Sequence, residues 1–286
     1  MSEAAHSHPG PALLAHEARV TYGPVPRVLD GHPVVPGTQR LSGDQFLFHT
    51  GSGYGLFYRK GAGVTVERGP QADPAEEALW LNGSVYAAIA AIHGYLPFHA
   101  SAVVWQDQAY AISGPSGAGK STLAAALGRH GLPLLCDDTL VLDLSDPGGV
   151  LCLPGHKRLK LTREAIDLTG AVAQEQVDPA IEKFYAAPPG GAVTAALPLA
   201  GLWFLEDGQD LSFEPIEGAA RLERLNDDHY TIDLFNAARA ESLADRFART
   251  ARLAAIIPMQ RLTRPRDPAQ FEGITARIAA RIKGET

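Results

Sequence analysis

Cysteine is scarce in this chain. Only Cys136 and Cys152 occur among 286 residues, and they do not form a C-x-x-C pair. A disulfide framework or a structural zinc site normally requires more thiols at closer spacing. The sequence therefore predicts neither, and a chain of this length can be stabilised by its apolar core alone.

Long apolar runs are also missing. A membrane-spanning helix requires roughly 18 or more consecutive apolar residues, and no uninterrupted stretch of the sequence reaches that length. Residues 1–16 lack the apolar centre of a secretory signal peptide. These features favour a cytoplasmic protein without a membrane partner.

The chain has no excess of basic residues. It contains 25 Lys and Arg against 32 Asp and Glu, which gives a net charge of −7 at pH 7. Proteins that bind nucleic acids usually carry a dominant basic surface. We therefore expect no nucleic-acid partner, and the 45% hydrophobic content is ordinary for a globular protein.

Residues 1–24 are rich in Ala, His, Pro and Gly and predict a flexible tail. Three histidines in this segment could in principle bind a metal, but their neighbours offer little to fix a coordination geometry. A tail without a metal is the favoured interpretation. The three histidines are His6, His8 and His16.

Residues 25–94 predict a small, mostly β domain followed by a linking helix. Short apolar runs at 46–48, 54–58 and 64–66 are typical of strands. The glycine-rich stretch 51–55 lies between two of them with no helix after it, so it predicts a hairpin turn rather than a nucleotide loop. Asp73 and Pro74 mark a helix start, and the helix should run to about His93.

Residues 95–286 alternate between strand and helix patterns, which predicts an α/β domain. Strands are expected at 109–112, 132–136, 139–144, 150–153, 202–205 and 211–213, and helices at 120–130, 162–168, 237–257 and 268–282.

The most informative stretch of this domain matches the phosphate-binding pattern G-x-x-x-x-G-K-[ST]. An expected strand precedes it and an expected helix follows, as the pattern requires. Its backbone N–H groups would surround phosphate oxygens, Lys120 would reach the β- and γ-phosphates, and the Ser121 hydroxyl would bind Mg²⁺. We therefore expect ATP and Mg²⁺ as cofactors. The loop residues are Gly114, Pro115, Ser116, Gly117, Ala118, Gly119, Lys120, Ser121 and Thr122.

Two carboxylates, Asp137 and Asp138, follow the loop closely and end the expected strand 132–136. They could merely cap a turn. However, the strand after the first helix of such folds commonly returns beside the loop strand, so its end lies near the terminal phosphate. One carboxylate could then hold Mg²⁺ or its water, and the other could accept a proton from an attacking hydroxyl.

These residues resemble the catalytic domain of the HPr kinase/phosphorylase family. The resemblance rests on Phe98-His-Ala-Ser-Ala-Val103, on the loop, and on Leu134-Leu-Cys-Asp-Asp138, and it is clear over about residues 95–145 and looser to about 265. It implies a P-loop kinase core related to phosphoenolpyruvate carboxykinase and phosphorylation of a serine on a small carrier protein. From spacing alone, His99 could be an ordinary packed or exposed histidine.

The resemblance also implies residue roles. His99 would lie beside the transferred phosphate, Lys120 would neutralise it, and Ser121 would bind Mg²⁺. Asp138 would accept the proton of the substrate serine, and Asp137 would support the metal.

Two departures narrow the resemblance. The family has a Leu-Glu-x-Arg-Gly element whose Glu binds metal and serves the phosphorylase reaction, whereas residues 154–161 here read PGHKRLKL. Phosphorolysis is therefore not expected. The first 95 residues also differ from the usual regulatory domain. Both features are similar to the HPr-kinase-like enzymes of lasso-peptide gene clusters, which phosphorylate a serine at or near the C-terminus of a precursor peptide.

The implied partner is thus a peptide or small protein bearing a serine. The alternative acceptors are a carrier protein and a small metabolite. A further alternative is a nucleotide-binding module that transfers no phosphate. The family resemblance suggests a homo-oligomer, and the different N-terminal region weakens that suggestion.

A basic cluster follows the acidic pair. Its members could form a solvated face, or they could contact ATP phosphates or a peptide carboxylate. The possible contact residues are Lys157, Arg158, Lys160 and, further along, Lys183; His156 and Arg163 complete the cluster, and Arg261, Arg264 and Arg266 are expected to be surface charge.

Overall fold

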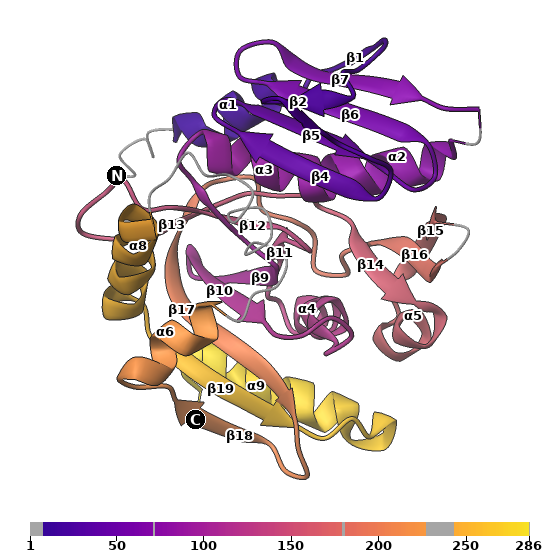
Figure 1. Ribbon diagram of the computed structural model, residues 1–286. Helices are drawn as coiled ribbons and strands as arrows, with labels where there is room; N and C mark the ends of the chain where they lie inside the picture. Colours follow the sequence, from indigo (N-terminus) through magenta and orange to yellow (C-terminus); the bar gives the residue numbers. More distant parts are fainter. Residues whose placement is uncertain (1–7, 71, 179–180, 227–242, 286) are drawn as a thin grey trace, which may run out of the picture.

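The computed structural model describes residues 8–70, 72–178, 181–226 and 243–285. Figure 1 shows an N-terminal sheet stacked on a larger central sheet, with helices between them and below. A small third sheet lies to one side, next to the helix that follows the phosphate-binding loop (Figure 1).

The N-terminal sheet has five strands in the order β1-β7-β6-β5-β4. All neighbours are antiparallel except β1 and β7. Because β5 and β6 pair directly, the glycine-rich stretch between them is a hairpin turn, as the sequence predicts. The strands are β1 (Val20–Tyr22), β4 (Thr38–Ser42), β5 (Gln45–His49), β6 (Tyr54–Arg59) and β7 (Gly63–Arg68), and a separate pair is formed by β2 (Val28–Leu29) and β3 (His32–Pro33).

The predicted flexible tail is wrong for its described part, because the chain forms helix α1 (Pro9–Glu17) and then β1. Leu14 is only 1% exposed and joins the core of the N-terminal domain. Glu17 accepts hydrogen bonds from the Tyr58 hydroxyl at 2.7 Å and from the Gly61 N–H at 2.9 Å. These partners lie far along the sequence, so local composition could not reveal them. Residues 1–7, including His6, lie outside the described residues.

The histidines that remain in this segment have structural partners. The ring of His8 accepts a hydrogen bond from the Gly10 N–H at 3.0 Å and contacts Asp143 at 2.9 Å. His16 contacts Arg19 at 2.9 Å. Within the described chain, no group of three or more His, Cys, Asp or Glu side chains is placed to hold a metal.

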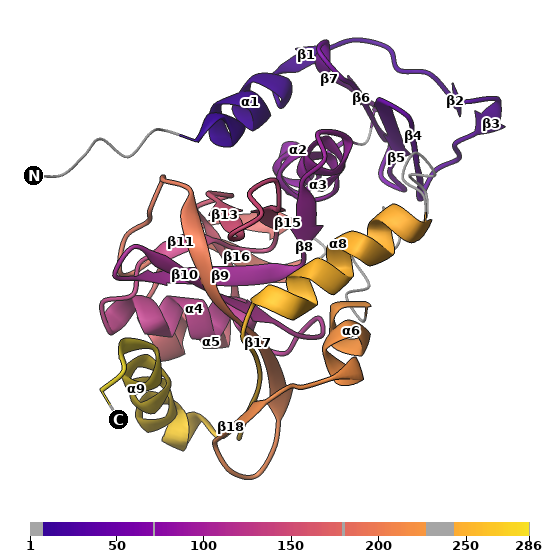
Figure 2. The ribbon, with the colours of Figure 1, turned by 90° about the vertical axis from the view of Figure 1, so that its left-hand side faces the viewer.

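The expected linking helix is present, with one irregular turn. It comprises α2 (Pro74–Trp80), a π-helical turn (Leu81–Val85) and α3 (Tyr86–Ile92). In Figure 2 it lies between the N-terminal sheet and the central sheet. Its alanines 87, 88 and 90 are fully buried in a cluster that also contains Val141 and Leu153 of the central sheet. The two parts of the chain therefore share this buried cluster.

The central sheet has nine strands with the path β11-β9-β10-β17-β13-β12-β8, and β19 joins β17 to β18. β10 is parallel to β17, and β17 is parallel to β19, so their carboxyl ends meet at one edge. The strands are β8 (Leu96–Phe98), β9 (Ala100–Trp105), β10 (Gln108–Ser113), β11 (Leu134–Cys136), β12 (Leu140–Asp143), β13 (Leu151–Leu153), β17 (Leu197–Asp207), β18 (Ser212–Pro215) and β19 (Met259–Arg264).

One expectation about this sheet is corrected. The strand after the first helix, β11, does not lie beside the loop strand β10, because β9 is inserted between them. Both β10 and β11 are antiparallel to β9, so they still run in the same direction. The end of β11 therefore reaches the same edge as the end of β10, one strand further away than predicted.

Helices cover both faces of the central sheet. α4 and α9 pack together on one face, where Leu123, Leu127 and Ile278 are fully buried. α6 and α8 pack on the other face through Leu225 and Leu253. The helices are α4 (Lys120–Arg129), α5 (Arg163–Thr169), α6 (Ala219–Asn226), α8 (Leu243–Ile256), a short 3₁₀ turn (Pro268–Gln270) and α9 (Phe271–Lys283).

The predicted helix 237–257 is seen as α8 from Leu243, and residues 237–242 lie outside the described residues. The third sheet was not predicted. It has the order β14-β16-β15, with bounds β14 (Leu159–Thr162), β15 (Val172–Asp178) and β16 (Ile181–Ala187). Among the described helices, none combines the length and apolar content needed to cross a membrane.

Candidate functional site

The phosphate-binding motif forms the strand–loop–helix arrangement that its sequence predicts. β10 ends at Ser113, and α4 begins at Lys120. Gly114, Gly117 and Gly119 all have positive φ, at 146°, 79° and 92°. A Cβ on Gly114 would lie 2.8 Å from the Leu205 carbonyl oxygen. Only glycine fits this close approach to β17, so the loop needs its glycines for both conformation and space.

Lys120 is buried at the base of the loop. Its side chain is 7% exposed, and its Nζ donates to the carbonyl oxygens of Gly114 at 2.8 Å and Pro115 at 3.2 Å. The ammonium is therefore held over the start of the loop. The first turn of α4 contributes the positive end of its dipole to the same place.

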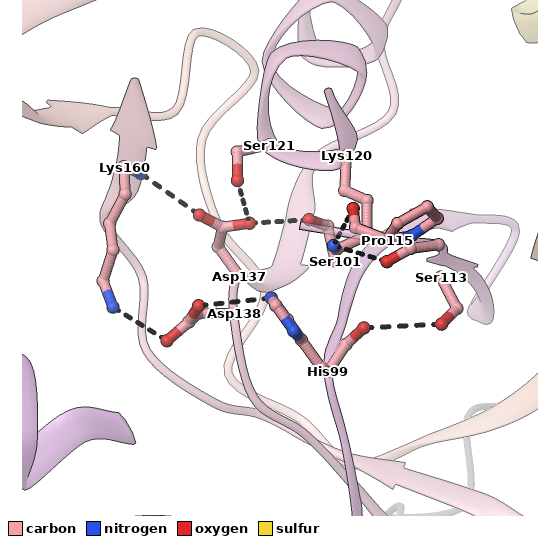
Figure 3. Close-up of polar contacts among 10 residues, drawn as sticks. His99, Ser101, Ser113, Pro115, Lys120, Ser121, Asp137, Asp138 and Lys160 are labelled. Carbon is pink, nitrogen blue, oxygen red and sulfur yellow. Dashed lines mark hydrogen bonds and ion pairs between the residues drawn. The ribbon is translucent and has the colours of Figure 1, made fainter. Parts of the chain in front are cut away.

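Asp137 is the most buried charged group of the site, at 1% exposure. Its Oδ1 accepts hydrogen bonds from the hydroxyls of Ser101 at 2.6 Å and Ser121 at 2.9 Å. Its Oδ2 accepts one from the backbone N–H of Lys160 at 3.1 Å. Figure 3 shows β9, α4 and β14 converging on this one carboxylate.

The donor set around Asp137 fits magnesium. Mg²⁺ prefers oxygen ligands and is usually held by one or two carboxylates together with substrate phosphates and waters. The Asp137 carboxylate and the Ser121 hydroxyl are such oxygens, already in contact at the end of the loop. Ser101 was not predicted, although it belongs to the motif Phe98-His-Ala-Ser-Ala-Val103 and faces inward from β9.

Asp138 has a different environment. Its φ is +72°, a left-handed conformation that is uncommon outside glycine and that Asp adopts more readily than most residues. Its Oδ2 accepts from Lys160 Nζ at 2.7 Å, and its Oδ1 lies 3.6 Å from His99 Nε2 (Figure 3). Burial by itself raises the pKa of Asp138, but Lys160, His99 and Lys120 outweigh it and hold the pKa below its ordinary value. The carboxylate is therefore ionised near neutral pH.

The loop and the acidic pair line one cavity of about 340 Å³. Two of the four basic candidates, Lys160 and Lys183, also line it, and so does His99. The complete lining is His99, Ser116, Gly117, Gly119, Lys120, Ser121, Thr122, Asp137, Asp138, Lys160, Thr162, Glu164 and Lys183.

The other two basic candidates are not part of this lining. Lys157 Nζ donates to the carbonyl oxygens of Leu135 and, at 2.5 Å, Val193, and burial lowers its pKa to about 8. Arg158 pairs with Glu175 and lies over the Tyr185 ring at 4.0 Å. Both side chains turn toward partners within the protein, and their possible contact with phosphate or substrate stays a prediction.

Of the three arginines in and just after β19 that are expected to be surface charge, Arg264 is buried instead. Arg264 is 6% exposed, and its Nη2 donates to the Ala118 carbonyl at 3.0 Å. Arg266 Nη2 donates to the Gly117 carbonyl at 3.0 Å. Both arginines thus donate hydrogen bonds to carbonyl oxygens of the phosphate-binding loop. Arg266 is nevertheless an exposed side chain that pairs with Asp207 at 2.6 Å, and Arg261 is half-exposed and pairs with Glu214 at 3.0 Å, so both match the prediction.

These arginines also mark a second hollow of about 140 Å³ beside the first. It shares Gly117, Gly119 and Thr122 with the larger cavity. Leu168 and Phe271 supply apolar wall. In the described structure the buried Nε of Arg264, which belongs to the same lining, has no hydrogen-bond partner. The signal that could have found Arg264 is its position at the carboxyl end of β19, the edge where the loop lies.

Comparisons with known proteins add little. No family model matches the chain, and no curated protein matches it. Among solved structures, the HPr(Ser) kinase/phosphatase from Coxiella burnetii is 13% identical and aligns with 66% of this chain and 99% of its own, with a TM-score of 0.33. A likeness at this level does not by itself establish a shared fold or activity.

Proposed function

We propose that this protein is an ATP- and Mg²⁺-dependent phosphotransferase that phosphorylates a serine hydroxyl on a peptide or protein. The observation that supports it most is the meeting of the loop lysine and the acidic pair in one cavity. The acidic pair directly follows β11, whereas Lys120 is the first residue of α4. The fold, not closeness in the sequence, brings them into the same cavity.

In this proposal the triphosphate lies in the larger cavity. The loop N–H groups, the α4 dipole and Lys120 all present positive charge to phosphate oxygens. The adjoining hollow, with Leu168 and Phe271, would take the nucleoside, since it is continuous with the loop and partly apolar. Arg264 and Arg266 would keep the loop carbonyls turned away from the phosphates.

Ser121 and Asp137 would hold Mg²⁺. When bound, the ion neutralises part of the phosphate charge. The role of Ser101 is to donate a hydrogen bond to Asp137 and fix its orientation.

Asp138 would accept the proton of the attacking hydroxyl. A bond then forms between that oxygen and the γ-phosphorus, and the bond from the γ-phosphorus to the bridging oxygen of ADP breaks. Lys120 stabilises the charge that develops on the transferred group. His99, 3.6 Å from Asp138, is close enough to hold the carboxylate in place or to contact the same phosphoryl group.

The finer proposal is that the acceptor is the serine near the C-terminus of a lasso-peptide precursor, in the cytoplasm where ATP is available. Its supports are the sequence resemblance and Lys183, a further lysine in the cavity, which suits an anionic segment next to the acceptor. A carrier protein or a small hydroxylated metabolite is the alternative acceptor.

The test uses ATP radiolabelled on its terminal phosphate, Mg²⁺, and two peptide libraries that differ only in serine against alanine. The intact protein should label the serine library. Asp138→Asn should lower labelling by about 10²- to 10⁴-fold, the usual contribution of a general base, and leave ATP affinity largely intact. Asp167→Asn, an exposed change on α5, is the matched control and should have no effect.

The outcomes distinguish a wrong base assignment from a protein that binds ATP without transferring phosphate. Full labelling by the Asp138→Asn protein would contradict the assignment of the base. ATP binding without labelling of peptides, carrier proteins or metabolites would favour a nucleotide-binding module.

A further inference from the structure

The two carboxylates of the acidic pair have unequal partners. Asp137 is bound by two hydroxyls and one backbone N–H, all of them neutral. Asp138 is bound by the ammonium of Lys160 at 2.7 Å. One of the two negative charges is therefore already matched by a fixed cation of the protein itself.

Lys160 is firmly placed for this contact. It lies within β14, which pairs with Tyr185 of β16 at this position. Its backbone N–H binds Asp137 while its side chain binds Asp138, so one residue spans the pair. The Lys160 side chain is only 10% exposed, and at this burial the ion pair is weakly screened by solvent.

We propose that Lys160 restricts this cavity to a single divalent cation, held by Asp137 and Ser121. The inference rests on the proposed function for the presence of nucleotide and Mg²⁺. Two adjacent carboxylates in a phosphate-binding cavity could otherwise hold two ions, as many phosphoryl-transfer sites do. Here a second ion at Asp138 would have to displace the Lys160 ammonium or lie beside it, and the like charges repel.

The surroundings of Asp138 add to this effect. Its other oxygen faces the His99 ring at 3.6 Å, and Lys120 lines the same cavity. Lys183 lines it as well. The cavity thus contains three lysines against the three carboxylates of Asp137, Asp138 and Glu164, so Asp138 is not an unmatched negative charge in the cavity.

A consequence follows for the chemistry. A carboxylate bound to a divalent cation is a poor proton acceptor, whereas one bound through a single oxygen to an ammonium keeps its other oxygen for this role. Lys160 is accordingly a positioning residue, which reserves Asp138 for the proton and leaves the metal to Asp137.

The experiment counts bound Mn²⁺, as a substitute for Mg²⁺, from the electron paramagnetic resonance signal of the free ion. It is done with saturating non-hydrolysable ATP analogue. The intact protein and Lys160→Arg should bind about one Mn²⁺ per chain. Lys160→Met and Lys160→Gln, which remove the charge, should bind about two. The double variant Lys160→Met/Asp138→Asn should return to about one, because the second site then lacks its carboxylate.

Circular dichroism identifies which variants fold, and the two uncharged substitutions give independent chances of a folded protein. About two Mn²⁺ in the intact protein, or about one in every folded uncharged variant, would overturn the inference. Failure of the intact protein to bind the analogue would instead refute the proposed function. In that case bound Mn²⁺ is counted again without nucleotide. If the uncharged Lys160 variants then bind no more Mn²⁺ than the intact protein, the inference is overturned as well.

Discussion

Replacing Lys157 with methionine tests whether this lysine belongs to the fold or to the site. Its ammonium donates to the backbone carbonyl oxygens of Leu135 and Val193, and burial lowers its pKa from 10.5 to about 8. Met fills a similar volume without the charge. The prediction is that Lys157→Met changes how stability depends on pH and leaves nucleotide affinity unchanged.

The sign follows from proton linkage. Below pH about 8 the lysine is charged in both states, and its burial costs the folded state about 3 kcal/mol relative to the neutral amine. Between about 8 and 10.5 the folded state has lost the proton and the unfolded state has kept it, so the free energy of unfolding rises with pH. From about pH 7 to about pH 10 the intact protein should gain about 2.5 kcal/mol from this group, and the variant should gain none of it.

The assay is urea unfolding followed by circular dichroism at several pH values, with the intact protein and the variant compared at each. Other groups act in the opposite direction. Burial raises the pKa of the Cys136 thiol to about 12, so unfolding becomes easier once unfolded thiols ionise. Groups that do not interact with Lys157 are common to both proteins and cancel in the difference. The Cys136 thiol is the exception, because the Lys157 charge lowers its pKa, and it affects the comparison only once unfolded thiols ionise.

Lys183→Met is the matched control, since Lys183 lines the cavity. It should weaken the binding of a fluorescent ATP analogue or the labelling of the acceptor. A difference between the intact protein and Lys157→Met that stays constant from about pH 7 to about pH 10 would refute the burial argument. Loss of nucleotide binding in Lys157→Met would show that this lysine contributes to the nucleotide site.

Three further changes test other parts of the structure. Arg264→Met should weaken ATP-analogue binding by about tenfold, because the Ala118 carbonyl loses a charged donor. Arg261→Met, at a half-exposed arginine away from the loop, should not, and equal effects would contradict the role of Arg264. Gly119→Ala should weaken ATP-analogue binding more than Gly117→Ala. Both glycines have positive φ, but only a Cβ on Gly119 would meet Arg264 Nη2, at 2.6 Å. Calorimetric titration measures the two affinities, and equal values would count against that clash. Leu14→Ala should lower the free energy of unfolding by about 2–5 kcal/mol, since Leu14 is buried, whereas exposed His16→Ala should change it little; a small effect of Leu14→Ala would support the original tail prediction.

Much of the site was predictable because its signals are local. The loop motif fixes glycine positions, a lysine and a hydroxyl within one short segment, and its flanking apolar runs predict the strand and helix that the structure contains. The hairpin turn and the linking helix were predictable for the same reason. The acidic pair was predictable as the end of a strand, although the insertion of β9 beside β10 was not.

The basic residues show where local signals fail. Lys157 and Lys160 lie three positions apart in one charged run, and nothing in their neighbours distinguishes them. One side chain meets two backbone carbonyls and the other meets Asp138. β14, which carries Lys160, also escaped prediction, because its pairing partner β16 lies further along the chain.

The sequence by itself determined that a phosphate-binding loop and two carboxylates are present, that the core is apolar, and that strands and helices alternate after the linking helix. Only the tertiary structure decided which charges enter the cavity, that Arg264 and Arg266 hold the loop, and that residues 9–22 are part of the fold. The physical reason is that a side chain's partner is set by long-range pairing and burial, and these depend on segments that are distant in the sequence.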